Sequence, residues 1–404
     1  MQTFITQELK DTPQGKEADR IIRSCVHCGF CTATCPTYQL LGDELDGPRG
    51  RIYLIKSLLE GNDATEKTRL HLDRCLTCRA CETICPSAVE YSRLLDIGRH
   101  EIEIKAPRSL PERFKRQLLL NIMPYRSRFA LLLFCGQIIR PLLPGKLKSM
   151  IPERRKTKIV KTRLHKRRVI LFRGCVQPAL NANINRAAIR VLDKLGVSAI
   201  EVKNETCCGA LSHHLGESAA GFMKANIDAW WPHIIDGAEA IINTASGCGV
   251  MLKDYAYLLR EDPDYADKAK TILEMTRDPV EFFTERETEK LQGIIKPADI
   301  RVAFQNPCTL QHGQKLGNRT EALLSSLGLV RLHVEDSILC CGSAGTYSLF
   351  QPELSAKLRQ NKINNLVNEN PDVILTANIG CQLHLQQATD VPVKHWIELV
   401  EELI

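Results

Sequence analysis

The sequence lacks the segments that direct a chain out of the cell or across a membrane. Its first twenty residues, MQTFITQELKDTPQGKEADR, contain no apolar core of an export signal, so we expect a cytoplasmic chain. Within residues 118–144 an uninterrupted apolar stretch runs only from Phe129 to Gly136. That is far shorter than the roughly 20 residues that cross a bilayer. The sequence therefore predicts no membrane-spanning helix.

Motifs for common catalytic chemistry are also missing. No G-x-G-x-x-G follows a predicted strand, no Walker lysine loop is present, and no Ser/His/Asp or paired-carboxylate motif stands out. Gly342 and Gly345 form a lone G-x-x-G, which is typical of a tight turn. The sequence therefore offers no candidate catalytic residue, and we expect catalysis to lie outside this chain.

Cysteine, by contrast, is abundant, with 17 residues in a chain of 404. Two runs, CVHCGFCTATCP at 25–36 and CLTCRACETICP at 75–86, place four cysteines each at the same spacings. A disulfide scaffold is typical of small exported domains instead. A zinc knuckle does not usually hold three cysteines in one C-x-x-C-x-x-C frame. The spacing and the closing proline are typical of iron–sulfur ligation.

The two runs predict a pair of [4Fe–4S] clusters with crossed ligands, because the fourth cysteine of such a run ligates the other cluster. The expected first set is Cys25, Cys28, Cys31 and Cys85, and the second is Cys75, Cys78, Cys81 and Cys35. Residues 48–60 predict a helix between the runs. Its Arg49 and Arg51 either steady the negatively charged clusters or form a solvated helix start.

The positive charge of the chain is concentrated in one segment. The net charge is +7, yet residues 105–168 hold 19 Lys/Arg and two acidic residues, a local charge of +17. Apolar residues flanked by arginine suggest an amphipathic segment on the inner face of an anionic membrane. A helical lid packed on the next domain is the alternative. No nucleic-acid motif accompanies the charge, so we expect no nucleic-acid partner.

From residue 168 onward the chain repeats itself. RVILFRGC, ETCCGA and NTASGC are followed by RVAFQNPC, ILCCGS and TANIGC, and every cysteine recurs 133 residues later. The cysteines of the first copy are Cys175, Cys207, Cys208 and Cys248. Those of the second copy are Cys308, Cys340, Cys341 and Cys381. Strand-like runs alternate with helical ones, which favours a parallel α/β sheet in each copy. Because each cysteine group follows a strand, the groups of one copy are expected to converge at one site.

The chemistry of the repeat cysteines stays open at this stage. Adjacent cysteines cannot both point inward from a regular strand. We therefore expect each pair on a bent turn that ends in Gly209 or Gly342. At least one copy is predicted to gather its four sulfurs around a further cluster or zinc, and redox thiols or inert buried thiols are the alternatives. Cys135 lies outside every frame and is interpreted as a packed thiol.

The expected fold class is α+β and multidomain. An α-helical two-cluster ferredoxin domain occupies 1–104, and a basic, partly amphipathic connector occupies 105–167. Two tandem α/β Cys-Cys-Gly repeats follow at 168–290 and 291–404.

The runs and repeats together resemble a known family over nearly the whole chain. The similarity is clearest in RSCVHCGFCTATCPTYQLLGDELDGPRGRIYLIK at 23–56 and CCGSAGTYSL at 340–349. The family comprises iron–sulfur subunits of glycolate oxidase (glycolate dehydrogenase), lactate utilisation and anaerobic glycerol-3-phosphate dehydrogenase. Heterodisulfide reductase is a more distant relative, and the glycolate oxidase subunits are the most similar. The fuller motif of the family ends in C-x-x-C, but Ala245 and Asn378 replace its first cysteine here.

The resemblance implies an electron-transfer subunit of a glycolate dehydrogenase complex whose acceptor is neither NAD nor oxygen. FAD-containing partner subunits would oxidise glycolate to glyoxylate, with D-lactate as a further substrate, and membrane quinone would accept the electrons. Oxidation removes two electrons while a cubane passes one, so a flavin elsewhere must split the pair. The alternatives are a subunit of another 2-hydroxy-acid or glycerol-3-phosphate dehydrogenase, a disulfide reductase at the Cys-Cys-Gly sites, and a non-enzymatic iron–sulfur sensor.

Overall fold

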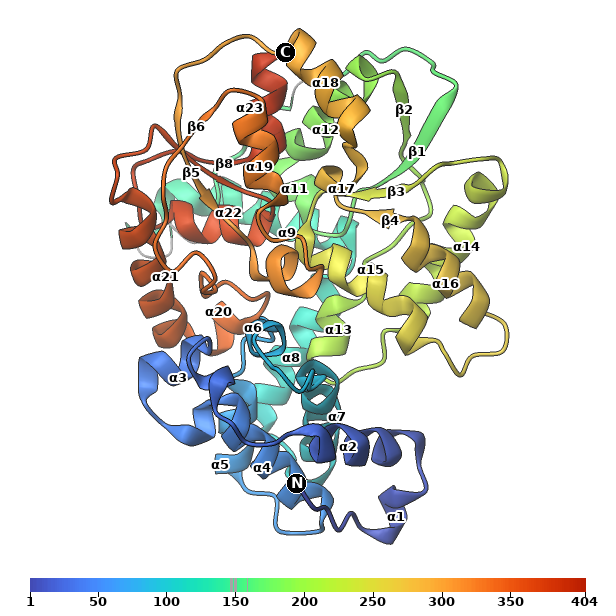
Figure 1. The fold of residues 1–404 in the computed structure, drawn as a ribbon, viewed down its shortest axis with the longest axis vertical. Coiled ribbons are helices and arrows are strands. Elements are labelled where there is room, and N and C mark those ends of the chain that lie inside the picture. Colours follow the sequence, from blue (N-terminus) through green and yellow to red (C-terminus); the bar gives the residue numbers. More distant parts are fainter. Residues whose placement is uncertain (146–147, 149–150, 158) are drawn as a thin grey trace. The chain divides into compact units, whose positions relative to one another are not determined.

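The computed structural model describes residues 1–145, 148, 151–157 and 159–404, so part of the predicted connector (146, 147, 149, 150 and 158) lies outside the described residues. The chain forms two compact units (Figure 1). Unit 1 combines Met1–Gln117 with two later stretches, His213–Glu217 and Asp336–Lys362. Unit 2 comprises Leu118–Ser212, Ser218–Glu335 and Ile363–Ile404.

Unit 1 is built from helices. They are α1 (Gln7–Lys10), α2 (Pro13–Ser24), η1 (Phe30–Thr32), α3 (Pro36–Leu41), η2 (Glu44–Asp46), α4 (Pro48–Leu59), α5 (Glu66–Asp73), α6 (Ala80–Thr83), α7 (Tyr91–Lys105), the start of α8 (Leu110–Ile122), α20 (Tyr347–Phe350) and the start of α21 (Pro352–Val367). Proline begins α2, α3 and α4, where its missing N–H and fixed φ suit a first helical turn. The helix predicted between the two cysteine runs is therefore confirmed as α4.

The core of unit 1 lies where α2, α4 and α7 pack together. Ile22, Ile55, Leu58 and Leu94 are fully or almost fully buried there. The α4–α7 approach depends on Gly98, because a Cβ at this position would lie 2.5 Å from Cγ1 of Ile55. This packing fixes the helices that flank both cysteine runs.

Unit 2 contains two four-stranded parallel sheets. The first has the order β2 (Val197–Ile200), β1 (Arg167–Phe172), β3 (Ile241–Asn243) and β4 (Thr276–Arg277). The second has the order β6 (Val330–Arg331), β5 (Arg301–Gln305), β7 (Val373–Thr376) and β8 (Val393–His395). All pairs are parallel, with Ile170 opposite Ile241 in one sheet and Val302 opposite Val373 in the other. Two α/β repeats after a helical cluster domain confirm the predicted fold class.

Helices connect the strands of unit 2. They are α11 (Gln177–Asn181), α12 (Asn183–Lys194), α13 (Ala210–His214), α14 (Ala220–Ile235), α15 (Ser246–Leu258), α16 (Ala266–Met275), α17 (Pro279–Phe282), α18 (Glu285–Ile294), η4 (Thr309–Gly313), α19 (Arg319–Ser326), α22 (Ile379–Gln386) and α23 (Trp396–Leu403). One apolar core runs through both repeats, from Val169 and Leu171 to Phe304 and Trp396. His395 joins them as well, since its Nε2 donates to the carbonyl oxygen of Thr244 at 2.9 Å. The repeats thus share one interior.

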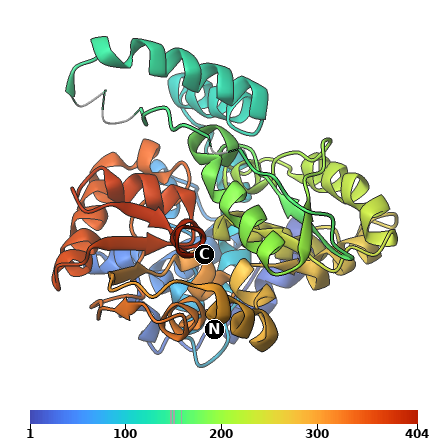
Figure 2. The same ribbon diagram turned by 90° about the horizontal axis from the view of Figure 1, so that it is seen from above.

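The predicted connector contributes α8, α9 (Arg126–Ile139) and η3 (Arg140–Leu142). Figure 2 shows α9 along the outside of unit 2, away from the strands. Its first residue is anchored, because the Arg126 guanidinium donates to the carbonyl oxygen of Gly174 at 2.9 Å. Among the described residues no single helix is long and apolar enough to cross a membrane, although α8 and Arg126–Leu142 pass that test as a sharply bent pair.

Candidate metal centres

The first candidate centre is a pocket of about 450 Å³, including its open mouth, in unit 1. Five cysteines from both runs line it: Cys25, Cys28, Cys31, Cys81 and Cys85. Short left-handed turns at His27 (φ 55°) and Gly29 (φ 87°) wrap the first run around the pocket. Ile52, Val89 and Tyr91 supply apolar walls. Cys85, the last cysteine of the second run, therefore lies with the first run.

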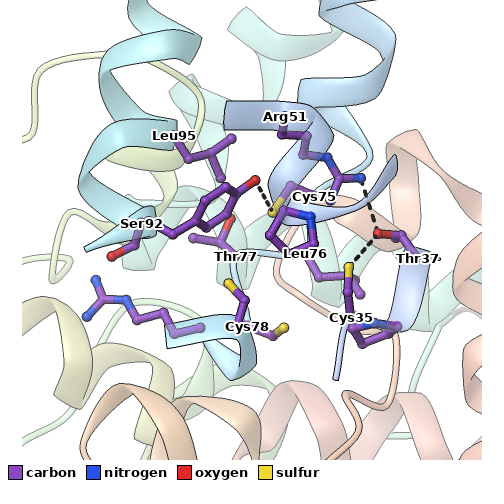
Figure 3. Close-up of a pocket in the computed structure, with 14 residues that line it drawn as sticks. Cys35, Thr37, Arg51, Cys75, Leu76, Thr77, Cys78, Ser92 and Leu95 are labelled. Atoms are coloured by element: carbon purple, nitrogen blue, oxygen red, sulfur yellow. Dashed lines mark hydrogen bonds between the residues drawn. The ribbon is translucent and has the colours of Figure 1, made fainter. Parts of the chain in front are cut away.

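The second candidate centre is a pocket of about 390 Å³, also within unit 1 (Figure 3). Its sulfurs are those of Cys35, Cys75, Cys78 and Cys81. Left-handed residues again bend the run, at Thr77 (φ 54°) and Arg79 (φ 61°). Cys35, from the first run, lies with the second run. The two pockets thus exchange their fourth cysteines, and Cys81 lines both.

Hydroxyl groups surround the second centre. The Tyr91 hydroxyl donates to Sγ of Cys75 at 3.7 Å, and the Thr37 hydroxyl lies 3.3 Å from Sγ of Cys35. Arg51 Nη2 donates to that Thr37 oxygen at 3.1 Å, a chain of contacts drawn in Figure 3. Burial raises the pKa of Tyr91 well above its ordinary value, so the phenol keeps its proton and acts as a donor.

A buried ion-pair network supports this chain of contacts. Asp46 is fully buried and pairs with Arg51 at 3.4 Å and with Arg74 at 2.8 Å. Arg51 is 1% exposed, and its Nε donates to the carbonyl oxygen of His71 at 2.7 Å. The solvated interpretation of Arg51 is therefore wrong. Arg49 differs, because it is 35% exposed and pairs with Glu44 at 2.6 Å.

The donor sets of both pockets suit an iron–sulfur cluster. Burial raises the pKa of Cys31 to about 11 and that of Cys81 well above its ordinary value. Such thiols stay protonated unless a cation replaces the proton, which is what coordination does. Each pocket is lined by at least four cysteines and by apolar walls, which matches the ligands that these clusters require.

The first repeat gathers its four cysteines inside unit 2. Sγ of Cys207 and Sγ of Cys175 are 3.5 Å apart, and Cys175 and Cys248 pack against the buried cluster that holds Cys207 and Cys208. Cys175 follows β1, the Cys207–Cys208 pair follows β2, and Cys248 lies in the first turn of α15 after β3. The cysteines of this copy thus follow the carboxyl ends of parallel strands, and the sulfurs of Cys175 and Cys207 meet there.

The cysteines of the second repeat are distributed over both units. Cys308 and Cys381 follow β5 and β7 in unit 2, and the Cys340–Cys341 pair belongs to unit 1. Both cysteine pairs lie on the predicted glycine-ended turn, with φ of 92° at Gly209 and 88° at Gly342. The amide of each glycine donates to the first sulfur of its pair, at 3.4 and 3.5 Å. Cys135 is exposed on α9, so its interpretation as a packed thiol is wrong.

Several polar groups of the site were missed from the sequence. Tyr91 and Thr37 were not singled out, although Thr37 directly follows the Cys-Pro that closes the first run. Asp96, His213 and His214 also place their ligand-type atoms within 4.8 Å of one another, with Asp96 and His213 in a 3.0 Å contact. The position of Thr37 shortly after the expected ligand Cys35 is the one sequence signal that could have identified it without the structure.

Comparison with protein families identifies two kinds of domain in the chain. Residues 21–89 match the 4Fe-4S dicluster domain. Residues 169–253 and 302–386 each match the cysteine-rich domain named for its Cys-Cys-Gly motif. The iron–sulfur character of the chain, with a dicluster domain and two cysteine-rich repeats, follows from these matches.

Curated relatives match the chain over half to all of its length. The glycolate oxidase iron-sulfur subunit of Escherichia coli is 53% identical over 407 aligned residues, which span 100% of this chain and 99% of the relative. A probable glycolate oxidase iron-sulfur subunit of Bacillus subtilis is 31% identical over 90% of this chain and 88% of its own. Lactate utilization protein A 2 of Bacillus mycoides is 25% identical over 54% of this chain and 90% of its own.

Proposed function

Since the chain belongs to the family of glycolate oxidase iron–sulfur subunits, we propose that it is the electron-transfer subunit of a flavin-dependent glycolate dehydrogenase. The complex would oxidise glycolate to glyoxylate and would also accept D-lactate. Because the chain offers no hydride-accepting motif, FAD-containing partner subunits take the electron pair from the substrate. Membrane quinone is the proposed acceptor, in place of NAD or oxygen.

The observation that carries this proposal is that eight cysteines from both runs line two pockets in unit 1, with the last cysteine of each run in the pocket of the other run. We assign Cys25, Cys28, Cys31 and Cys85 to one [4Fe–4S] cluster, and Cys75, Cys78, Cys81 and Cys35 to the other. When bound, each cluster takes up and releases one electron at a time. The chain's own residues hold the clusters side by side, since Cys81 lines both pockets, and their apolar walls limit the access of water.

The function is tested on the complex purified anaerobically with its flavoprotein partners. Glycolate should reduce an artificial dye, and it should also produce the electron paramagnetic resonance signal of reduced clusters in this subunit. Cys78→Ser should abolish the second cluster signal and the dye reduction that depends on it. Cys135→Ser is the matched control, because that exposed thiol lies outside every centre. Reduction by glycerol 3-phosphate alone, or reduction of a disulfide without glycolate activity, would assign the chain to one of the alternative functions.

We further propose that the four cysteines of the first repeat bind a metal, either a further cluster or zinc. The 3.5 Å separation of Cys175 and Cys207 is within the roughly 4 Å that separates thiolates on one zinc ion. Iron and zinc analysis of Cys208→Ser and Cys135→Ser, each in the full complex, tests this. Equal metal content in both variants would show that these cysteines bind no metal and would favour the alternative of inert thiols.

Peripheral attachment to the inner face of the cell membrane is proposed for α9. Large apolar side chains of this helix are exposed: Leu131, Leu132, Phe134, Ile138 and Ile139. Residues 105–168 add a net charge of +17, and near an anionic surface each Lys or Arg contributes about 1 kcal/mol. Apolar side chains beside clustered positive charge suit the interface of an anionic bilayer.

Flotation of the complex with vesicles tests the attachment. Vesicles with anionic lipid should carry the complex at low salt, neutral vesicles should not, and salt should weaken the effect. Ile138→Asp should reduce recovery, whereas Leu164→Asp should not, because Leu164 is 99% exposed but lies outside the helix. Equal recovery on both vesicle types, or equal effects of both variants, would contradict membrane attachment and favour the alternative, in which α9 is a lid packed on the next domain.

A further inference from the structure

Two sulfurs of the second centre lie in contact with side-chain hydroxyls. Tyr91 begins α7 and is 4% exposed, and its hydroxyl donates to Sγ of Cys75 at 3.7 Å. A coordinated cysteine has lost its proton, so its sulfur can only accept. The contact therefore persists when Cys75 is a ligand, with the phenol as the donor.

Thr37 provides the second hydroxyl. Its hydroxyl donates to the carbonyl oxygen of Asp46 at 2.7 Å, and its oxygen lies 3.3 Å from Sγ of Cys35, where either atom can be the donor. Once Cys35 has lost its proton as a ligand, only the hydroxyl can donate in that contact. Arg51 donates to the same oxygen at 3.1 Å, which makes the hydroxyl a better donor. Arg51 and Asp46 are both buried beside Thr37, and Asp46 also contacts buried His71 at 3.0 Å and pairs with Arg74, whose side chain is 26% exposed.

The first centre has a different environment. The amide N–H of Val89 donates to Sγ of Cys85 at 3.5 Å, a contact from the backbone and not from a hydroxyl. The arginine beside this centre, Arg49, is 35% exposed and paired with Glu44. Solvent screens a charge at the surface far more than a buried one. The N-terminal ammonium also donates to the carbonyl oxygen of Cys25 at 3.3 Å. Among the described residues, the hydroxyl contacts to cysteine sulfurs and the fully buried arginine are therefore found at the second centre.

We propose that Tyr91, Thr37 and Arg51 are positioning residues that make the second centre the more easily reduced of the two, so that electrons pass from the first set of sulfurs to the second. The inference rests on the proposed electron-transfer function. Reduction adds negative charge, which spreads onto the ligand sulfurs. Hydrogen bonds to the sulfurs and nearby positive charge stabilise that charge, and both are known to tune cluster potentials.

The test is a redox titration of the purified complex with mediators, without glycolate, followed by electron paramagnetic resonance. Cys28→Ser and Cys78→Ser assign the signals to the first and second centre. In the unmodified protein the second centre should be reduced first. Tyr91→Phe should shift the reduction equilibrium of the second centre by about tenfold, which is about 59 mV for one electron, towards lower potential. The first centre should titrate as before.

Matched variants separate this effect from damage to the fold. Tyr53→Phe removes a phenol whose ring packs on His27 beside the first pocket, and it should leave the second centre unchanged. Thr37→Val should also lower the potential of the second centre, and Thr37→Ser should restore it. If the Tyr91→Phe protein loses iron, the comparison of Thr37→Val with Thr37→Ser tests whether the hydroxyl raises the potential of the second centre. A first centre that is reduced before the second, or Tyr91→Phe and Thr37→Val proteins that titrate like the unmodified one, would overturn the proposal.

These outcomes stay separate from the proposed function. Potentials are set with mediators, so they can be measured even if glycolate does not reduce the complex. If glycolate reduces both clusters but their order is the reverse, the function stands and the positioning roles of Tyr91, Thr37 and Arg51 fail.

Discussion

Asp278 should make unit 2 less stable as the pH rises, which is the reverse of the usual behaviour of a carboxylate. This residue is the N-cap of α17 and is 1% exposed. One of its oxygens accepts from the amide of Val280 at 3.1 Å, and the other, Oδ2, is buried and has no hydrogen-bond partner among the described residues. Burial, together with the nearby Glu281 carboxylate, raises the pKa of Asp278 to about 7.

The sign and size of the effect follow from this shift. Between pH 3.8 and 7 the folded chain holds a proton that the unfolded chain has released, so stability falls as pH rises. From pH 6 to 8.5 the expected loss is about 1.4 kcal/mol, the value of one pKa unit. For a unit of this size that corresponds to roughly 3–6 °C in melting temperature.

Tryptophan fluorescence is a suitable assay, because all three tryptophans (230, 231 and 396) lie in unit 2. Asp278→Asn keeps an oxygen for Val280 N but cannot ionise, so its melting temperature should vary less between pH 6 and 8.5 than that of the unmodified protein. Asp267→Asn is the control, since the Asp267 side chain is 94% exposed. If Asp278→Asn and the unmodified protein lose stability in parallel over this range, the argument from burial is wrong.

Three further predictions concern packing and protonation. His395 is fully buried and its pKa is lowered to about 4 by burial, so the chain should lose about 3 kcal/mol as pH falls from 6.5 to 4, and urea titration of His395→Asn should not show this loss. Gly98→Ala should lower the melting temperature of unit 1 by crowding Ile55 (about 1–3 kcal/mol), and the added substitution Ile55→Val should recover part of it in a thermal scan. Gly209→Ala should lower the metal content of the first repeat, because φ at this position is 92° and the added Cβ would lie 2.9 Å from Cβ of Ala219. The control Gly196→Ala, where φ is 81° and no atom lies within 4 Å of the added Cβ, should leave the metal content unchanged.

The features that could be predicted from the sequence are those that recur at fixed spacing. The C-x-x-C runs predicted two four-sulfur groups, and the 133-residue offset predicted two similar sheets. β1, β2 and β3 recur as β5, β6 and β7 at about this offset. The glycine-ended turns at Gly209 and Gly342 followed from a steric argument about adjacent cysteines. Local rules of this kind need no knowledge of the tertiary structure.

What the sequence did not predict depends on tertiary contacts. The position of Arg51 at a helix start indicates a surface residue, but its contacts with Asp46 and with the carbonyl oxygen of His71 lie in the interior of unit 1. Tyr91 follows the second run by several residues and carries no motif, so its contact with Cys75 emerges only when α7 is in place. Cys135 lies in an apolar stretch that normally indicates burial, but α9 exposes it.

The discontinuity of unit 1 also has a consequence for synthesis of the chain. Met1–Gln117 leaves the ribosome first, but Asp336–Lys362, which completes the unit, follows only after most of unit 2. At about 5–20 residues per second, the ribosome adds this interval in on the order of ten seconds or more. The nascent cluster domain therefore passes through a period in which its cysteine runs are made but its last stretch is absent. Delivery of iron and sulfide must either occur on this incomplete unit or wait for the release of the whole chain.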